Sequence, residues 1–132
     1  MTSKVIYLGE LRTSSTHIQS GSQIVSDAPV DNNGKGEAFS PTDNVANALA
    51  TCMFTVMGIK AGEMGVDMDG STAEVTKFMQ ASPRKIEKIQ VVFTMNADAD
   101  NKTRTILERT AMTCPVHLSL NPDIIRDITF NW

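Results

Sequence analysis

A long apolar segment that follows a helix-start signature is the feature that most constrains the fold. Ser40 can cap a helix, Pro41 suits the first helical position, and Asp43 supplies an acid in the first turn. The predicted helix runs from there to about Gly62 or Gly65 and is apolar on nearly every face. A helix that is apolar on nearly every face is normally buried, so we expect a central helix enclosed by the rest of the fold.

The segments on either side of this helix predict strands. Apolar side chains recur with a period near two over residues 5–11, and the polar segment 12–19 that follows also tolerates a strand. A turn signal at Ser20–Gly21 then precedes a further predicted strand at 22–26. Residues 27–40 are rich in Asp, Asn and Gly, which predicts a long loop of a kind that is often functional. Residues 73–79 and 89–95 predict a hairpin, 100–112 a second helix, and 128–132 a last strand after a short helix at Pro115. This order predicts an α+β fold with an antiparallel sheet around the central helix.

Length and charge limit the class of protein. A chain of 132 residues suggests one domain, and a net charge of -3 offers no basic surface for nucleic acid. The first residues lack a secretory signal, and no apolar run is expected to be long enough to cross a bilayer. We therefore expect a cytosolic protein that needs no membrane. In that reducing compartment a disulfide would be transient rather than structural.

Two cysteines are the residues with the most chemical potential. Cys52 lies within the apolar helix, where it can be a small core residue, and it needs a nearby cation to become reactive. Cys114 precedes Pro115 and can cap the short helix, with its sulfur over free backbone amides. That position favours a thiolate, or a thiol that is easily drawn into exchange. The pair is either two inert core residues or one divided redox site.

Other chemistries have weaker support. A metal site built from Cys52, Cys114, His117 and His17 lacks the paired spacing that normally fixes ligand geometry. We expect His117 to face solvent or to have its hydrogen bonds satisfied. No nucleophile-elbow pattern indicates a serine hydrolase. No metal or organic cofactor is expected.

The sequence resembles the OsmC/Ohr family of osmotically inducible and organic-hydroperoxide-resistance proteins. The resemblance is carried by the helix entry at 40–43 leading to residues 48–52, by Thr113-Cys114-Pro115-Val116, and by the element order, so it spans essentially all of 1–132. It implies a single OsmC-like domain that forms an intertwined homodimer, and a thiol-dependent peroxidase acting on organic hydroperoxides. By position, Cys52 would be the peroxidatic cysteine, Cys114 the resolving cysteine, and Arg12 the catalytic arginine.

One departure from the family concerns the residue that holds the arginine. Peroxidase members have a glutamate ten residues before the first cysteine, where this chain has Thr42. Asp43 and Glu37 are the candidate replacements, although Asp43 is also explained as a helix-start acid. On a straight helix Asp43 lies roughly 13 Å from Cys52, so it could act only by anchoring a loop that carries Arg12. That loop could belong to the same subunit or to its partner.

The implied reaction uses both thiols. Arg12 would stabilise the Cys52 thiolate, which attacks a hydroperoxide; Cys114 would then form a disulfide that an external dithiol reduces. Apolar residues around Cys52, namely Met53, Phe54 and Val56, would favour an organic peroxide. Two alternatives remain open. The chain could bind a small apolar ligand at a dimer cleft without catalysis, or both cysteines could be structural in an interaction module.

Overall fold

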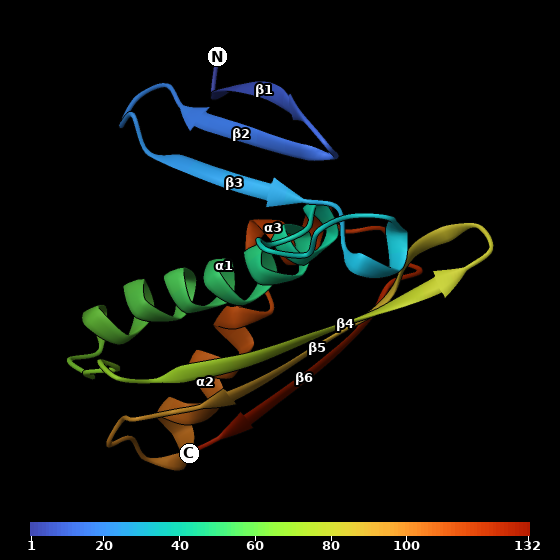
Figure 1. Cartoon of the computed structure of the whole chain (residues 1–132). Coiled ribbons are helices and arrows are strands. Elements are labelled where there is room, and N and C mark those ends of the chain that lie inside the picture. Colours follow the sequence, from blue (N-terminus) through green and yellow to red (C-terminus); the bar gives the residue numbers. More distant parts are fainter. The chain divides into compact units, whose positions relative to one another are not determined.

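The computed structural model describes residues 1–132, which form two compact units, Met1–Val45 and Ala46–Trp132 (Figure 1). Each unit contains a three-stranded sheet, and the long helix α1 begins in the first unit and continues through the second. The predicted α+β class with a central helix is confirmed.

The first unit is an antiparallel sheet followed by a loop. Its strands β1 (Ser3–Gly9), β2 (Arg12–His17) and β3 (Gln23–Asp27) pair in sequence order. The predicted loop over 27–40 contains a short 3-10 turn, η1 (Val30–Asn32). Four successive apolar residues of the edge strand β1 are each at least half exposed: Val5, Ile6, Tyr7 and Leu8. The single chain therefore leaves both faces of β1 open to solvent.

Helix α1 (Pro41–Glu63) begins where its sequence predicts. The Ser40 hydroxyl accepts the Asp43 backbone N–H at 3.0 Å, and the Asp43 carboxylate accepts the Ser40 N–H at 2.8 Å. These two bonds form a reciprocal capping box, which satisfies backbone donors that the first helical turn leaves unpaired. The interpretation of Asp43 as a helix-start acid is confirmed.

One stripe of α1 is buried, and the expected burial on every face is wrong for the single chain. The buried residues recur every three or four positions: Ala46, Leu49, Ala50, Met53, Met57 and Ala61. Ile59, by contrast, is 63% exposed. By length and composition alone α1 could also cross a membrane, which corrects the expectation that no segment reaches that length. The core helix of a globular fold passes the same test, and this buried stripe gives α1 such a role.

The second unit builds a mixed sheet. Strands β4 (Thr72–Ala81) and β5 (Arg84–Thr94) form the predicted antiparallel hairpin. Strand β6 (Ile125–Asn131) adds to β5 in parallel, with Ile125 opposite Lys88. The connection between them contains α2 (Asn101–Ala111) and α3 (Pro115–Ser119), because a parallel pair requires a long crossover. The expected antiparallel pairing thus holds for the first sheet and the hairpin but not for the last strand.

The core of the second unit explains how its helices are positioned. Ile89, Val91 and Phe93 alternate along β5 and are completely buried, as the period-two pattern predicts. The Phe93 ring meets Phe54 of α1 edge-on at 4.8 Å and stacks on Phe130 of β6 at 4.9 Å. The same cluster contains the buried side of α1, the end of α2 and the start of α3. Packing on β5 therefore brings the middle of α1 close to the first residue of α3.

Candidate functional site

Cys52 lies in the middle of α1, on the boundary between its buried stripe and its exposed face. Its side chain is partly buried and packs against the core, and its thiol is free. The neighbouring Met53, one of the apolar residues expected to favour an organic peroxide, is completely buried in the core. Phe54 and Val56 are partly exposed and remain available to an apolar ligand. Cys52 is thus a thiol that a small molecule can approach.

Cys114 caps α3, as the sequence predicts. Its backbone is extended (φ -63°, ψ 142°), and Pro115 occupies the first helical turn. The Cys114 Sγ accepts the backbone N–H of His117 at 3.3 Å. The residue is completely buried, and its thiol is free. This geometry fixes the sulfur at the end of a helix while keeping solvent away from it.

The pKa of Cys114 is shifted in the direction opposite to the one expected from the sequence. Burial raises the pKa of the Cys114 thiol, and this effect outweighs the amide of His117, which favours the thiolate. The nearby thiol of Cys52 raises the pKa of Cys114 further. The expectation of a thiolate at Cys114 is therefore wrong, because desolvation opposes ionisation more than one helix terminus supports it, and the alternative of a thiol that is easily drawn into exchange stays a prediction. Cys114 belongs to the hydrophobic cluster against which Cys52 packs.

His117 differs from what the sequence suggested. Its Nδ1 atom is buried and has no hydrogen-bond partner, whereas a solvent-facing or satisfied histidine was expected. Desolvation, followed by the positive charge of Arg126, lowers the pKa of His117 below its usual value. The Arg126 guanidinium also donates to the His117 carbonyl at 3.4 Å. The imidazole next to Cys114 is consequently neutral at pH 7.

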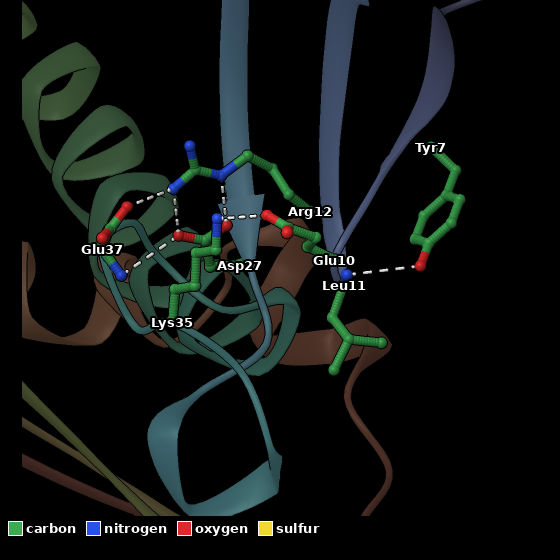
Figure 2. A network of polar contacts seen from close by, with 7 residues as sticks. All are labelled: Tyr7, Glu10, Leu11, Arg12, Asp27, Lys35 and Glu37. Atoms are coloured by element: carbon green, nitrogen blue, oxygen red, sulfur yellow. Dashed lines mark hydrogen bonds and ion pairs between the residues drawn. The ribbon is translucent and has the colours of Figure 1, made fainter.

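Arg12 stands in a cluster of carboxylates within the first unit (Figure 2). Its Nε and Nη2 donate to the two carboxylate oxygens of Asp27 at 2.6 and 2.8 Å. Nη2 also donates to Glu37 at 2.8 Å, and the Glu37 backbone N–H donates to Asp27 at 3.1 Å. Two acids therefore fix the plane of the guanidinium, as expected for a bidentate arginine pair.

Asp27 is the residue of this cluster that sequence reasoning missed. It lies at the end of β3, directly opposite Arg12 in the antiparallel register, and is almost completely buried. The hydrogen bonds that Arg12 donates to Asp27 lower the pKa of Asp27, and those that it donates to Asp27 and Glu37 raise its own pKa. Both groups are therefore charged at neutral pH. The signal available in the sequence was a pair of opposite charges at facing ends of two predicted strands.

The turn before Arg12 places it at the start of β2. Glu10 and Leu11 both have left-handed backbone conformations, with φ of 50° and 62°. Positive φ at two successive residues is typical of a tight hairpin turn that normally favours Asn or Gly. Glu10 pairs with Lys35, which lowers the pKa of Glu10, and the Leu11 N–H donates to the Tyr7 hydroxyl at 3.3 Å (Figure 2). The local strain next to Arg12 is thus held by contacts on both sides of the turn.

Among the carboxylates considered for Arg12, Glu37 contacts the guanidinium, and Asp43 is engaged with the Ser40 amide. The structure thus shows a helix-capping role for Asp43, and its role toward the arginine stays a prediction. Thr42, at the position of the family glutamate, lies with its hydroxyl 3.2 Å from that of Ser40.

Other chemistry has little structural basis. No group of three or more His, Cys, Asp or Glu residues is placed to hold a metal ion. An open, polar pocket of about 470 Å³ is lined by Asp67, Asp69, Met95, Asn96, Ala97 and Asp98, none of which the sequence singled out. The two cysteines are free thiols in one hydrophobic cluster, one partly exposed and one buried.

Comparisons with known proteins identify the family and the fold. The sequence profile of the family described as OsmC-like protein matches residues 34–128. A Psychrobacter arcticus protein, whose name refers to osmotic stress induction and a detoxification response, is 53% identical, with 99% of this chain and 96% of that chain covered and a TM-score of 0.96. No curated protein sequence matches the chain.

More distant structures share the fold. A Legionella pneumophila protein, named OsmC and an organic hydroperoxide resistance protein, is 13% identical, with 100% and 98% of the two chains covered and a TM-score of 0.74. A Vibrio cholerae protein named for organic hydroperoxide resistance, with captopril bound in one of its active sites, is 15% identical, with 99% and 92% covered and a TM-score of 0.73.

Proposed function

Because this chain belongs to the OsmC-like protein family, we propose that it is a thiol-dependent peroxidase that reduces organic hydroperoxides. The single observation that supports the proposal is the asymmetry of two free cysteines that share one hydrophobic cluster. Cys52 is partly exposed, whereas Cys114 is completely buried, and Cys52 is near enough to raise the pKa of the Cys114 thiol. In this proposal the exposed thiol reacts with the substrate and the buried thiol reacts with the oxidised product.

In the first step the Cys52 thiolate attacks the distal oxygen of the hydroperoxide. A sulfur–oxygen bond forms, the oxygen–oxygen bond breaks, and the alkoxide leaves and takes up a proton to become an alcohol. The sulfur is oxidised to a sulfenic acid while the peroxide is reduced. Phe54 and Val56, partly exposed near Cys52, favour the apolar portion of an organic substrate.

In the second step Cys114 resolves the oxidised Cys52. Its sulfur forms a disulfide, and the hydroxyl of the sulfenic acid leaves as water. An external dithiol then takes over the disulfide and restores both thiols. No metal or organic cofactor enters either step, because the two sulfurs carry all the electrons transferred.

Arg12 is the cation that we assign to the Cys52 thiolate and to the developing alkoxide. Its support is the fixed, fully charged guanidinium held by Asp27 and Glu37. In this proposal Asp27 and Glu37 hold the guanidinium of Arg12. In the peroxidase members of the family this role belongs to a glutamate at the position of Thr42. Asp43 contributes by fixing the start of α1, which follows the same loop.

The proposed assembly is a homodimer in the cytosol. Its support is the edge strand β1, whose apolar residues are at least half exposed on both faces in the single chain. Burial of such a strand in a second subunit would remove the exposed apolar surface. A reducing compartment would supply the dithiol that regenerates the enzyme.

The test is hydroperoxide consumption with dithiothreitol or a dihydrolipoyl donor, using cumene hydroperoxide and hydrogen peroxide. We expect wild-type turnover that prefers the organic peroxide, none with Cys52→Ser, and at most slow turnover with Cys114→Ser. A wild-type rate equal to that of Cys52→Ser would overturn the peroxidase proposal. Binding of cumyl alcohol without turnover would instead favour the non-catalytic ligand-binding alternative.

A further inference from the structure

Two cations and three carboxylates share the cluster around Arg12, and the proposed mechanism accounts for only part of it (Figure 2). Arg12 holds the carboxylates of Asp27 and Glu37. The second cation, Lys35, pairs instead with Glu10 in the turn before β2. Lys35 and Glu10 take no part in the reaction steps, although each lies two residues from a member of the Arg12 ion pairs.

Lys35 lies within electrostatic reach of the two acids that hold Arg12. The hydrogen bond with Glu10 is the main cause that raises the pKa of Lys35, and the charge of Glu37 raises it further. The hydrogen bonds that Arg12 donates are the main cause that lowers the pKa of Asp27, and the charge of Lys35 adds to this effect. The field of Lys35 therefore acts on both carboxylates that fix the guanidinium.

The exposure of these side chains allows Lys35 to change partner. Its side chain is 45% exposed and that of Glu37 is 64% exposed, so packing does not fix either of them. Lysine is a point charge on a flexible stem, whereas the planar guanidinium of Arg12 needs its carboxylates in a fixed geometry. Lys35 without its own partner would therefore compete with Arg12 for the Glu37 carboxylate.

The turn that carries Glu10 is held next to the segment that carries Lys35. Glu10 and Leu11 have positive φ, a strained conformation that persists only where neighbouring contacts hold it. The Leu11 carbonyl accepts the Ala28 N–H at 3.1 Å, and the Ala28 carbonyl accepts the Gly36 N–H at 3.2 Å. Glu10 is thus a carboxylate that the backbone keeps within reach of the second cation.

We propose that Glu10 positions Arg12 by binding the competing cation, Lys35. Glu37 then stays on the guanidinium and helps to fix its plane. This role rests on the proposed peroxidase function, in which the guanidinium stabilises the thiolate of Cys52. Glu10 touches neither the substrate nor the sulfur, and it acts only through the choice of partner that it leaves to Lys35.

Neutral variants test the competition. Glu10→Gln removes the partner of Lys35, Lys35→Gln removes the competing cation, and the double variant removes both. Glu63→Gln is the matched control, because it breaks a similarly exposed pair with Lys60 at the end of α1. Nitrogen NMR of the labelled protein measures the rotation rate of the Arg12 guanidinium about its Cζ–Nε bond without any peroxide, and Arg12→Lys identifies the signal by its loss. Hydroperoxide consumption measures kcat/KM for the same variants.

We expect Glu10→Gln to speed the rotation about threefold and to lower kcat/KM by a similar factor, as is typical of an exposed ion pair. Lys35→Gln, the double variant and Glu63→Gln should all keep the wild-type values. An unchanged rotation rate in Glu10→Gln would overturn the proposal. So would a double variant that stays impaired, because the pair would then be a structural brace. Faster rotation with unchanged turnover would support the positioning by Glu10 and refute the role of Arg12 in the proposed function.

Discussion

Oxidation of the Cys52–Cys114 pair is expected to stabilise the protein strongly. The disulfide closes a loop of about 60 residues, for which loss of chain entropy in the unfolded state predicts about 4 kcal/mol of added unfolding free energy. In the reduced structure the two side chains already share one hydrophobic cluster, and Cys52 is near enough to raise the pKa of Cys114. For a domain of this length the gain corresponds to a rise in Tm of about 15 °C.

Denaturant unfolding of the fully reduced and the oxidised protein measures this difference directly. The oxidised sample is prepared with one equivalent of diamide, and mass spectrometry verifies its internal disulfide. Both samples are kept at the same protein concentration, because dimerisation would shift the denaturant midpoint of unfolding. Cys114→Ser treated in the same way is the control and should not change. An oxidised protein with an unchanged or lower unfolding free energy would refute the reasoning, because the disulfide would then strain the native state as much as it restricts the unfolded one.

Three further outcomes follow from the contacts described above. Asp27→Asn should reduce hydroperoxide turnover at least tenfold, because it removes the charge that fixes Arg12. Glu37→Gln should have a smaller effect, because this carboxylate is exposed. Both effects are measured as kcat/KM with cumene hydroperoxide. Ser40→Ala should lower the unfolding free energy by about 1 kcal/mol through loss of the helix cap, measured by urea unfolding. Folding lowers the pKa of His117, so the unfolded state binds a proton at this residue more readily than the folded state does. The unfolding free energy is therefore unaffected by this group above pH 6.5 and falls as the pH drops from 6.5 through the folded-state pKa. Wild type should therefore lose stability on acidification more steeply than His117→Asn.

Features that depend on neighbouring residues could be predicted from the sequence. The capping box of Ser40 and Asp43 uses a spacing of three residues, and the alternation along β5 is visible as a period of two. The N-cap position of Cys114 follows from the proline after it. In each case the physical cause lies within one turn or one strand.

Features that depend on packing could not be predicted. Because α1 is apolar all round, its sequence does not reveal which stripe meets the sheet, and Met53 rather than Cys52 proves to be completely buried. Asp27 becomes the partner of Arg12 only through the register of β2 and β3. The pKa of Cys114 is set by the depth of its burial, which no local pattern encodes.

The asymmetry of the thiol pair has a benefit and a cost for the proposed reaction. If both cysteines were exposed, either could ionise in water and attack the other without assistance. Burial of Cys114 protects it from direct oxidation and keeps it next to Cys52, but the same burial keeps its proton in place. A resolving thiol in this position should therefore react faster as the pH rises toward its raised pKa, and the rate of disulfide formation against pH measures that cost of burial directly.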